Sequence, residues 1–203
     1  MTASVSSIPP TARGQRTRQA LIDATASLVA ERGFHTVRIA DIGAAAGVSG
    51  AAIYRHFANK DELLVAVFES VVADLISGAR SAITTSESLI DTLAKLIDAH
   101  VTFALNRGDV IRVYDQEAHN LPISQRKRVR RQQRAYAQLW SEVVEQIRPS
   151  WSGPEATAAV HGVFALINSV STYRTTLSVE VQRRLLQDLA TQALAQQCAV
   201  SAN

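Results

Sequence analysis

Residues 33–63 read GFHTVRIADIGAAAGVSGAAIYRHFANKDEL, and this stretch decides the fold of the first part of the chain. Gly47 supplies the positive φ that a tight turn between two helices requires. Ser49 follows it as a favourable N-cap residue for the next helix. The stretch therefore predicts a helix-turn-helix, with helices at about 39–46 and 50–56. The small core around the turn is expected to contain Ile42, Val48 and Ile53.

The second helix of this motif and the residues just after it carry the side chains that a DNA-facing element needs. Tyr54, His56 and Lys60 offer polar and cationic tips for phosphate oxygens, with Arg55 between them. The alternative for Lys60 is a solvated surface position, and a phosphate contact is the favoured interpretation. Gly50 and Ala51 present only backbone N–H groups and a methyl group, so few side chains at the helix start can read base edges.

Four sequence features carry a resemblance to a known family, namely Gly33-Phe34, Ile42-Gly43, Ala46-Gly47-Val48-Ser49 and Ile53-Tyr54-Arg55-His56-Phe57-Ala58-Asn59-Lys60-Asp61-Glu62-Leu63. Together they closely resemble the DNA-binding domain of TetR-type transcriptional repressors. Arg38 stands where the family usually has a capping Ser or Thr, and its longer cation could reach a phosphate. The DNA-binding residues that the resemblance implies are Arg38, Ser49, Gly50, Ala51, Tyr54, His56 and Lys60.

Composition sets the broad class of protein. The 203 residues are 47% hydrophobic and 19% charged, as in globular proteins, and no apolar run is long enough to span a membrane. The first residues lack the apolar centre of a secretory signal, which favours a cytoplasmic protein. The single cysteine, Cys198, excludes an intrachain disulfide, and no metal site or cofactor is expected. Residues 1–60 carry seven Lys and Arg against three Asp and Glu, an excess suited to phosphate neutralisation.

The rest of the chain predicts helices only, because apolar residues recur at helical spacing and no sustained period-two alternation occurs. We expect an all-α protein with a disordered arm at 1–13, a three-helix DNA-binding domain at 14–62 and a helical effector-binding and dimerisation domain at 63–200. One further helix is expected to begin after a cap at Asn59 and to reach about residue 75. The other helices outside the motif are expected at about 15–32, 86–106, 109–119, 124–147, 154–172 and 178–197.

The resemblance implies that the second domain binds a small molecule and forms a homodimer through its last two helices. The alternative is that these are ordinary core helices. Candidate pocket residues are large or polar side chains on otherwise apolar stretches, and plain core packing explains the aromatic ones equally well. The expected pocket residues are Phe103, Glu117, Tyr136, Trp140, Phe164 and Asn168, with His100, Tyr114, His119 and Asn120 as further candidates.

Residues 124–134, SQRKRVRRQQR, hold six cations and no acid. Their simplest interpretation is a solvated helix face. The i, i+4, i+8 spacing of Arg126, Arg130 and Arg134 also suits a cationic entrance to an aromatic pocket. An effector with an apolar tail and phosphates, such as an acyl-CoA, would match such an entrance.

No nucleophile elbow, phosphate loop or metal-ligand spacing occurs, so an enzyme is not expected. We therefore expect a ligand-responsive repressor that binds a pseudo-palindromic double-stranded DNA operator as a homodimer, with no membrane partner. The alternatives are a DNA-binding dimer without an effector, and a helical enzyme or carrier with an incidental helix-turn-helix.

Overall fold

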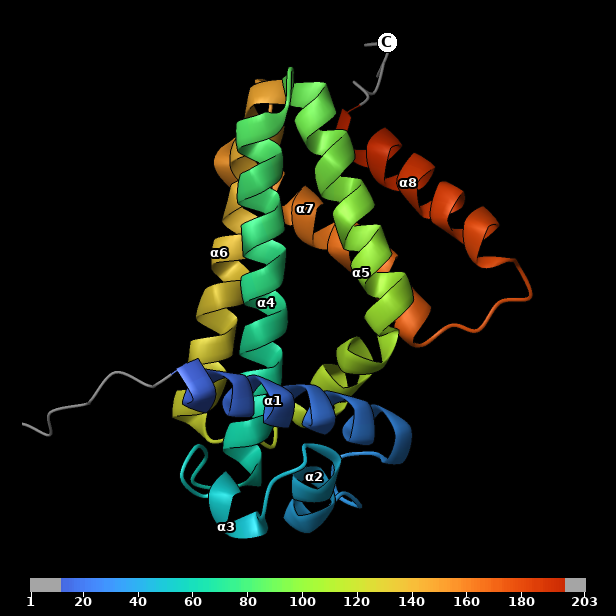
Figure 1. Ribbon diagram of the computed structural model, residues 1–203. Helices are drawn as coiled ribbons and strands as arrows, with labels where there is room; N and C mark the ends of the chain where they lie inside the picture. The colour runs from blue at the N-terminus through green and yellow to red at the C-terminus, as the bar shows by residue number, and fades with distance from the viewer. Residues whose placement is uncertain (1–11, 196–203) are drawn as a thin grey trace, which may run out of the picture. The chain divides into compact units, whose positions relative to one another are not determined.

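The structure is a computed structural model that describes residues 12–195, and these form helices and connecting turns without a β-strand. The prediction of an all-α protein is therefore confirmed. The elements are α1 (Ala12–Arg32), α2 (Ile39–Ala45), α3 (Gly50–Ile53), α4 (Lys60–Thr85), α5 (Leu89–Glu117), α6 (Ile123–Ile147), α7 (Gly153–Asn168), η1 (Ser169–Ser171) and α8 (Val179–Ala195) (Figure 1). Most of the expected arm, and the chain end that contains Cys198, lie outside the described residues. Ala12 and Arg13, the last two residues of that arm, are helical.

The chain divides into two compact units, residues 1–67 and 68–203, and the division falls inside α4. In the first unit, α2 packs against both α1 and α3. The core of this unit is formed by fully buried aliphatic side chains, among them Leu21, Val37, Ile42 and Ile53.

The turn between α2 and α3 has the backbone geometry that the sequence predicts. Gly47 has a φ of 68°, in the left-handed region that glycine adopts without steric cost. The Val48 N–H donates to the Gly43 carbonyl oxygen at 2.9 Å. A Cβ atom on Gly43 would lie 2.9 Å from the Val48 carbonyl oxygen, so the missing side chain allows this close approach of the backbone. α3 is shorter than expected and ends at Ile53.

Helix capping in the first unit differs in part from the expectation. Ser49 occupies the N-cap of α3, but its side chain makes no cap hydrogen bond. At α2, the side chain of Asp41 provides the capping interaction, because its carboxylate accepts from the Arg38 backbone N–H at 2.9 Å. Asn59 acts as predicted, and its Oδ1 accepts from the Glu62 N–H at 2.8 Å. These contacts define where α2 and α4 begin.

In the second unit, α7 contacts α5, α6 and α8, and α5 contacts α6 and α8 (Figure 1). The two helices expected over 86–106 and 109–119 are two helical segments of α5 that meet across a kink at Arg107, whose φ of −130° and ψ of 28° are not helical. The break predicted at Asn106-Arg107-Gly108 is therefore confirmed. None of the helices in the described part of the chain is long and apolar enough to cross a bilayer.

Candidate DNA-binding surface and effector cavity

The start of α3 exposes mainly backbone. Ser49, Gly50 and Ala51 are all solvent-exposed. No heavy atom lies within 4 Å of the position that a Cβ on Gly50 would take. Backbone N–H groups at a helix start that is not sterically blocked can approach a phosphate closely. Ala52 and Ile53 face the opposite way, into the core of the unit.

The residues after α3 form a turn and not the last part of a helix. Tyr54 is 60% exposed. This exposure is high for an aromatic side chain, unless the side chain contacts another molecule. Arg55 is exposed and His56 is half-buried. The Lys60 Nζ lies 4.3 Å from the centroid of the Phe34 ring, a cation–π contact that holds the ammonium group in place. Arg38 is exposed at the start of α2.

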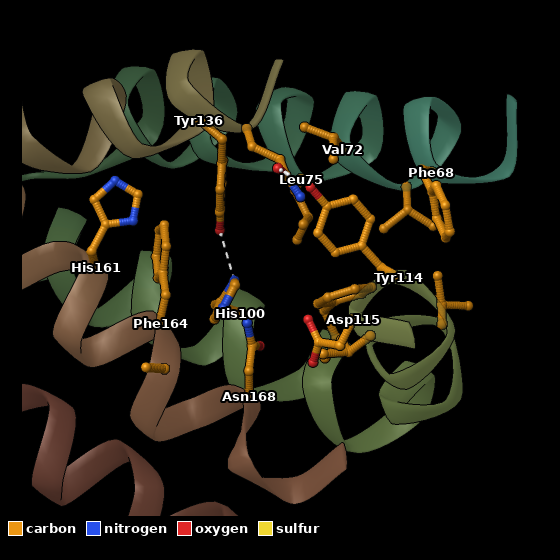
Figure 2. Close-up of a pocket in the computed structure, with 16 residues that line it drawn as sticks. Phe68, Val72, Leu75, His100, Tyr114, Asp115, Tyr136, His161, Phe164 and Asn168 are labelled. Atoms are coloured by element: carbon orange, nitrogen blue, oxygen red, sulfur yellow. Dashed lines mark hydrogen bonds between the residues drawn. The ribbon is translucent and has the colours of Figure 1, made fainter. Parts of the chain in front are cut away.

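A cavity of about 320 Å³ lies in the second unit, between α4, α5, α6 and α7. Figure 2 shows side chains from these four helices pointing into it. Its apolar lining is Phe68, Val71, Val72, Leu75, Phe103, Val110, Ile111, Phe164 and Ala165. Its polar lining is His100, Tyr114, Asp115, Gln133, Tyr136, His161 and Asn168. A concave, mainly apolar space with a few polar groups is the usual form of a small-molecule site.

His100 is the central polar group of this cavity. It is 3% exposed, and its Nδ1 lies 3.2 Å from the Tyr136 hydroxyl oxygen (Figure 2). The Phe164 ring stacks on it at 4.5 Å between centroids. Burial lowers the pKa of His100 to about 4, although the neighbouring Asn168 acts in the opposite direction. The imidazole is therefore neutral at pH 7.

Two other polar residues of the lining are Tyr114, which is hydrogen-bonded, and Asp115, whose carboxyl group ionises less readily than usual. The Tyr114 hydroxyl donates to Gln133 Oε1 at 2.9 Å, and its ring meets Phe68 edge-on at 5.1 Å. Burial raises the pKa of the Asp115 carboxyl, since desolvation disfavours the charged form. No Lys or Arg is among the described residues that line the cavity.

Four of the six expected pocket residues line the cavity: Phe103, Tyr136, Phe164 and Asn168. Trp140 lies outside the lining, fully buried, with its ring 5.0 Å from that of Phe164. Glu117 is also outside it, near the end of α5, where its carboxylate accepts from Asn120 Nδ2 at 3.4 Å. The sequence did not predict that α4 contributes residues to the cavity lining. An apolar stripe has the same sequence pattern whether it packs in a core or lines a cavity.

The arginine stripe of α6 does not form an entrance to the cavity. Arg130 and Arg134 are exposed, and Arg126 donates to the His119 carbonyl oxygen at 3.3 Å. Gln133 is the α6 residue that lines the cavity together with Tyr136. Arg128, next to the stripe, forms a bidentate pair with Glu69 of α4, at 2.8 and 2.7 Å.

No group of three or more His, Cys, Asp or Glu side chains that could hold a metal ion occurs within residues 12–195. The polar groups of the cavity lie among aromatic and aliphatic side chains, an arrangement suited to binding an organic molecule.

Comparison with known proteins places the chain in a family. Residues 21–67 match the family model for bacterial regulatory proteins of the tetR family, and residues 86–173 match the tetracyclin repressor-like C-terminal domain. The chain is 27% identical over 184 residues to the HTH-type transcriptional repressor KstR2 of Rhodococcus jostii, covering 87% of this chain and 76% of that protein. It is 28% identical over 125 residues to the fatty acid metabolism regulator protein of Bacillus subtilis, covering 62% of this chain and 59% of that protein.

A solved structure of FadR from Bacillus subtilis in complex with stearoyl-CoA has a similar fold, with a TM-score of 0.71 at 20% identity, covering 86% of this chain and 98% of that one. The chain belongs to the TetR family of bacterial transcriptional regulators. The resemblance of residues 33–63 to this family is confirmed, and the match of residues 86–173 extends the similarity to the second unit.

Proposed function

We propose that this protein is a ligand-responsive, DNA-binding transcriptional repressor that acts as a homodimer. The observation that carries the proposal is the cavity of about 320 Å³ in the same chain as a helix-turn-helix unit. A second unit that served only dimerisation would have no need of such a cavity, since packed cores contain few voids larger than a water molecule. The alternative of a DNA-binding dimer without an effector is therefore disfavoured.

DNA binding is assigned to the exposed end of the helix-turn-helix. Backbone N–H groups at Ser49, Gly50 and Ala51 and the side chains of Tyr54 and Lys60 would contact phosphates. The same surface includes His56 and Arg38. Two such units, one helical turn of DNA apart, would bind a pseudo-palindromic operator.

Dimerisation through α7 and α8 is supported by their exposed faces. On α8, Val181, Leu185 and Leu189 are 38–47% exposed and recur every four residues, so they form one apolar stripe. On α7, Ala158, Gly162 and Ala165 are exposed and allow close approach of a second helix. Small and apolar residues on neighbouring helices suit a two-fold interface with a second copy of the chain.

The effector is assigned to the cavity. Its apolar lining suits an acyl chain or a similar apolar molecule. The similar structure of FadR from Bacillus subtilis is a complex with stearoyl-CoA, a molecule with such a chain. Since no Lys or Arg is among the described lining residues, the phosphates of a CoA ester would remain outside the cavity. An effector releases DNA only if it binds one conformational state more tightly than the other. The assigned role involves no catalysis, and it places the protein with DNA in the cytoplasm.

The test is fluorescence anisotropy of labelled DNA from upstream of the protein's own gene, titrated with protein at several salt concentrations. Acyl-CoA esters and free apolar ligands are then added to the complex. Salt-sensitive binding that one ligand reverses supports the proposal. If no sequence is bound, even after selection from random DNA, the assignment of DNA binding fails. If DNA is bound but no ligand alters binding at saturation, the effector part fails alone.

A further inference from the structure

Asp115 is the only acidic side chain among the described residues that line the cavity, and the same lining contains no Lys or Arg. In the view of Figure 2, its carboxyl group lies between the side chains of Tyr114 and Asn168. No hydrogen bond or ion pair to Asp115 occurs within residues 12–195, and burial is the cause of the upward shift in its pKa. The carboxyl group has thus lost part of its water without gaining a partner in the protein.

The position of Asp115 suits a charged group of a ligand. The residue lines the cavity and is also solvent-exposed, so its carboxylate lies where the cavity meets water. Contact with water keeps this group ionised at pH 7, whereas the buried His100 is neutral. A ligand can therefore place a charged group beside Asp115 without leaving water completely, while its apolar part lies deeper in the cavity.

The rest of the lining favours a positive charge over a negative one. The face of an aromatic ring carries negative partial charge and attracts cations. The Tyr114 hydroxyl donates its hydrogen to Gln133, so it offers a ligand only its oxygen. An anionic ligand would meet the like charge of Asp115, and no described Lys or Arg of the lining would compensate it. The aromatic side chains of the lining, besides its histidines, are Phe68, Phe103, Tyr114, Tyr136 and Phe164.

We propose that the effector cavity selects an apolar molecule that carries one positive charge, such as an alkylammonium ion, and that the Asp115 carboxylate binds its cationic group. The apolar part would lie against the Val72 and Leu75 side chains of α4 and the ring of Phe164. The inference rests on the proposed function for the role of the cavity. It deepens that function by naming the charge of the effector.

The test is isothermal titration calorimetry of the full chain with three probes that share an eight-carbon chain: n-octylammonium, n-octanol and octanoate. The measurement is made at pH 8, where an ordinary histidine is neutral and the amine is still protonated. We expect octylammonium to bind about fivefold more tightly than octanol, and octanoate to bind most weakly. Equal affinities for octylammonium and octanol overturn the proposal. Absence of octylammonium binding below its micelle concentration overturns it as well.

Variants locate the preference at the carboxylate. Asp115→Asn keeps the shape of the side chain and removes its charge, so it should abolish the fivefold difference between octylammonium and octanol. Asp109→Asn is the matched control, because it removes the same charge from the same helix at a residue outside the cavity lining. It should leave the ratio unchanged. A ratio that survives Asp115→Asn contradicts the assignment, and the wild-type probe series remains decisive if a variant does not fold.

The calorimetric result does not depend on DNA. Preferential binding of octylammonium without release of DNA supports the cation site and counts against effector control. Because an organic cation can itself bind DNA phosphates, release through the cavity must be lost in Asp115→Asn. Release of DNA by an acyl-CoA ester, combined with equal affinities for octylammonium and octanol, supports the repressor and overturns the cation site.

Discussion

Acidification should destabilise the second unit through His100. Burial lowers the pKa of this imidazole to about 4, whereas the unfolded chain has the ordinary value near 6.5. Between these two values the unfolded state binds a proton that the folded state does not. The stabilising contribution is therefore fully present above the unfolded pKa and is lost as the pH falls from about 6.5 towards 4.

The size of the effect follows from the two pKa values. A difference of about 2.5 pKa units corresponds to roughly 3 kcal/mol in the free energy of unfolding. Between pH 7 and pH 5, where most of this titration occurs, the loss is about 2 kcal/mol. No reduction for solvent screening is needed, since the side chain is 3% exposed.

Urea unfolding followed by tryptophan fluorescence measures this loss in the relevant unit, because Trp140 and Trp151, the two tryptophans of the chain, both lie in it. The comparison is between wild type and His100→Phe at pH 7 and pH 5, at one protomer concentration. His161→Phe serves as the exposed-histidine control and should keep the wild-type pH dependence. Contributions from the other titratable groups of the lining, such as Asp115, cancel in the difference between wild type and variant. If His100→Phe shows the same loss as wild type on acidification, the reasoning is refuted.

Three further predictions address the first unit and the proposed dimer. Leu185→Asp combined with Leu189→Asp should weaken dimerisation at least 100-fold in sedimentation experiments. The reason is that burying the exposed part of both side chains in two protomers contributes about 3–5 kcal/mol. The control variant Thr191→Asp, elsewhere on α8, should leave dimerisation unchanged. Lys60→Ala should lower the slope of log affinity against log salt by about two for a dimer, whereas Lys60→Arg should preserve it; an unchanged slope for the alanine variant would exclude a phosphate contact. Gly47→Ala should destabilise the helix-turn-helix by about 1 kcal/mol because of its φ of 68°, and faster amide exchange in α2 and α3 would measure this.

The helix-turn-helix was predictable because its signals are local. A positive φ at Gly47 and a cap at Asn59 each depend on a few neighbouring residues, and both occur where the sequence placed them. Arg38 and Ser49 were less informative. Neither side chain caps its helix, and Asp41 provides the contact at α2. A capping preference states which residue type is favoured at a position, but the local packing decides whether the bond is made.

The arginine stripe shows the limit of spacing arguments. Positions i, i+4 and i+8 establish that Arg126, Arg130 and Arg134 share one face of α6. The spacing does not establish which neighbour that face meets. Tyr136 and Gln133 lie on the face that lines the cavity, while Arg130 and Arg134 are exposed.

The sequence alone determined an all-α chain with a DNA-binding motif of the TetR type, because helical periodicity, turn residues and caps are properties of short segments. It also placed aromatic and polar residues on the helices of the second unit. Only the tertiary structure decided that His100, Tyr136 and Asn168, from three different helices, meet in one cavity and that Trp140 lies behind its wall. The physical reason is that a cavity arises from packing between helices distant in sequence, and no single segment encodes that packing.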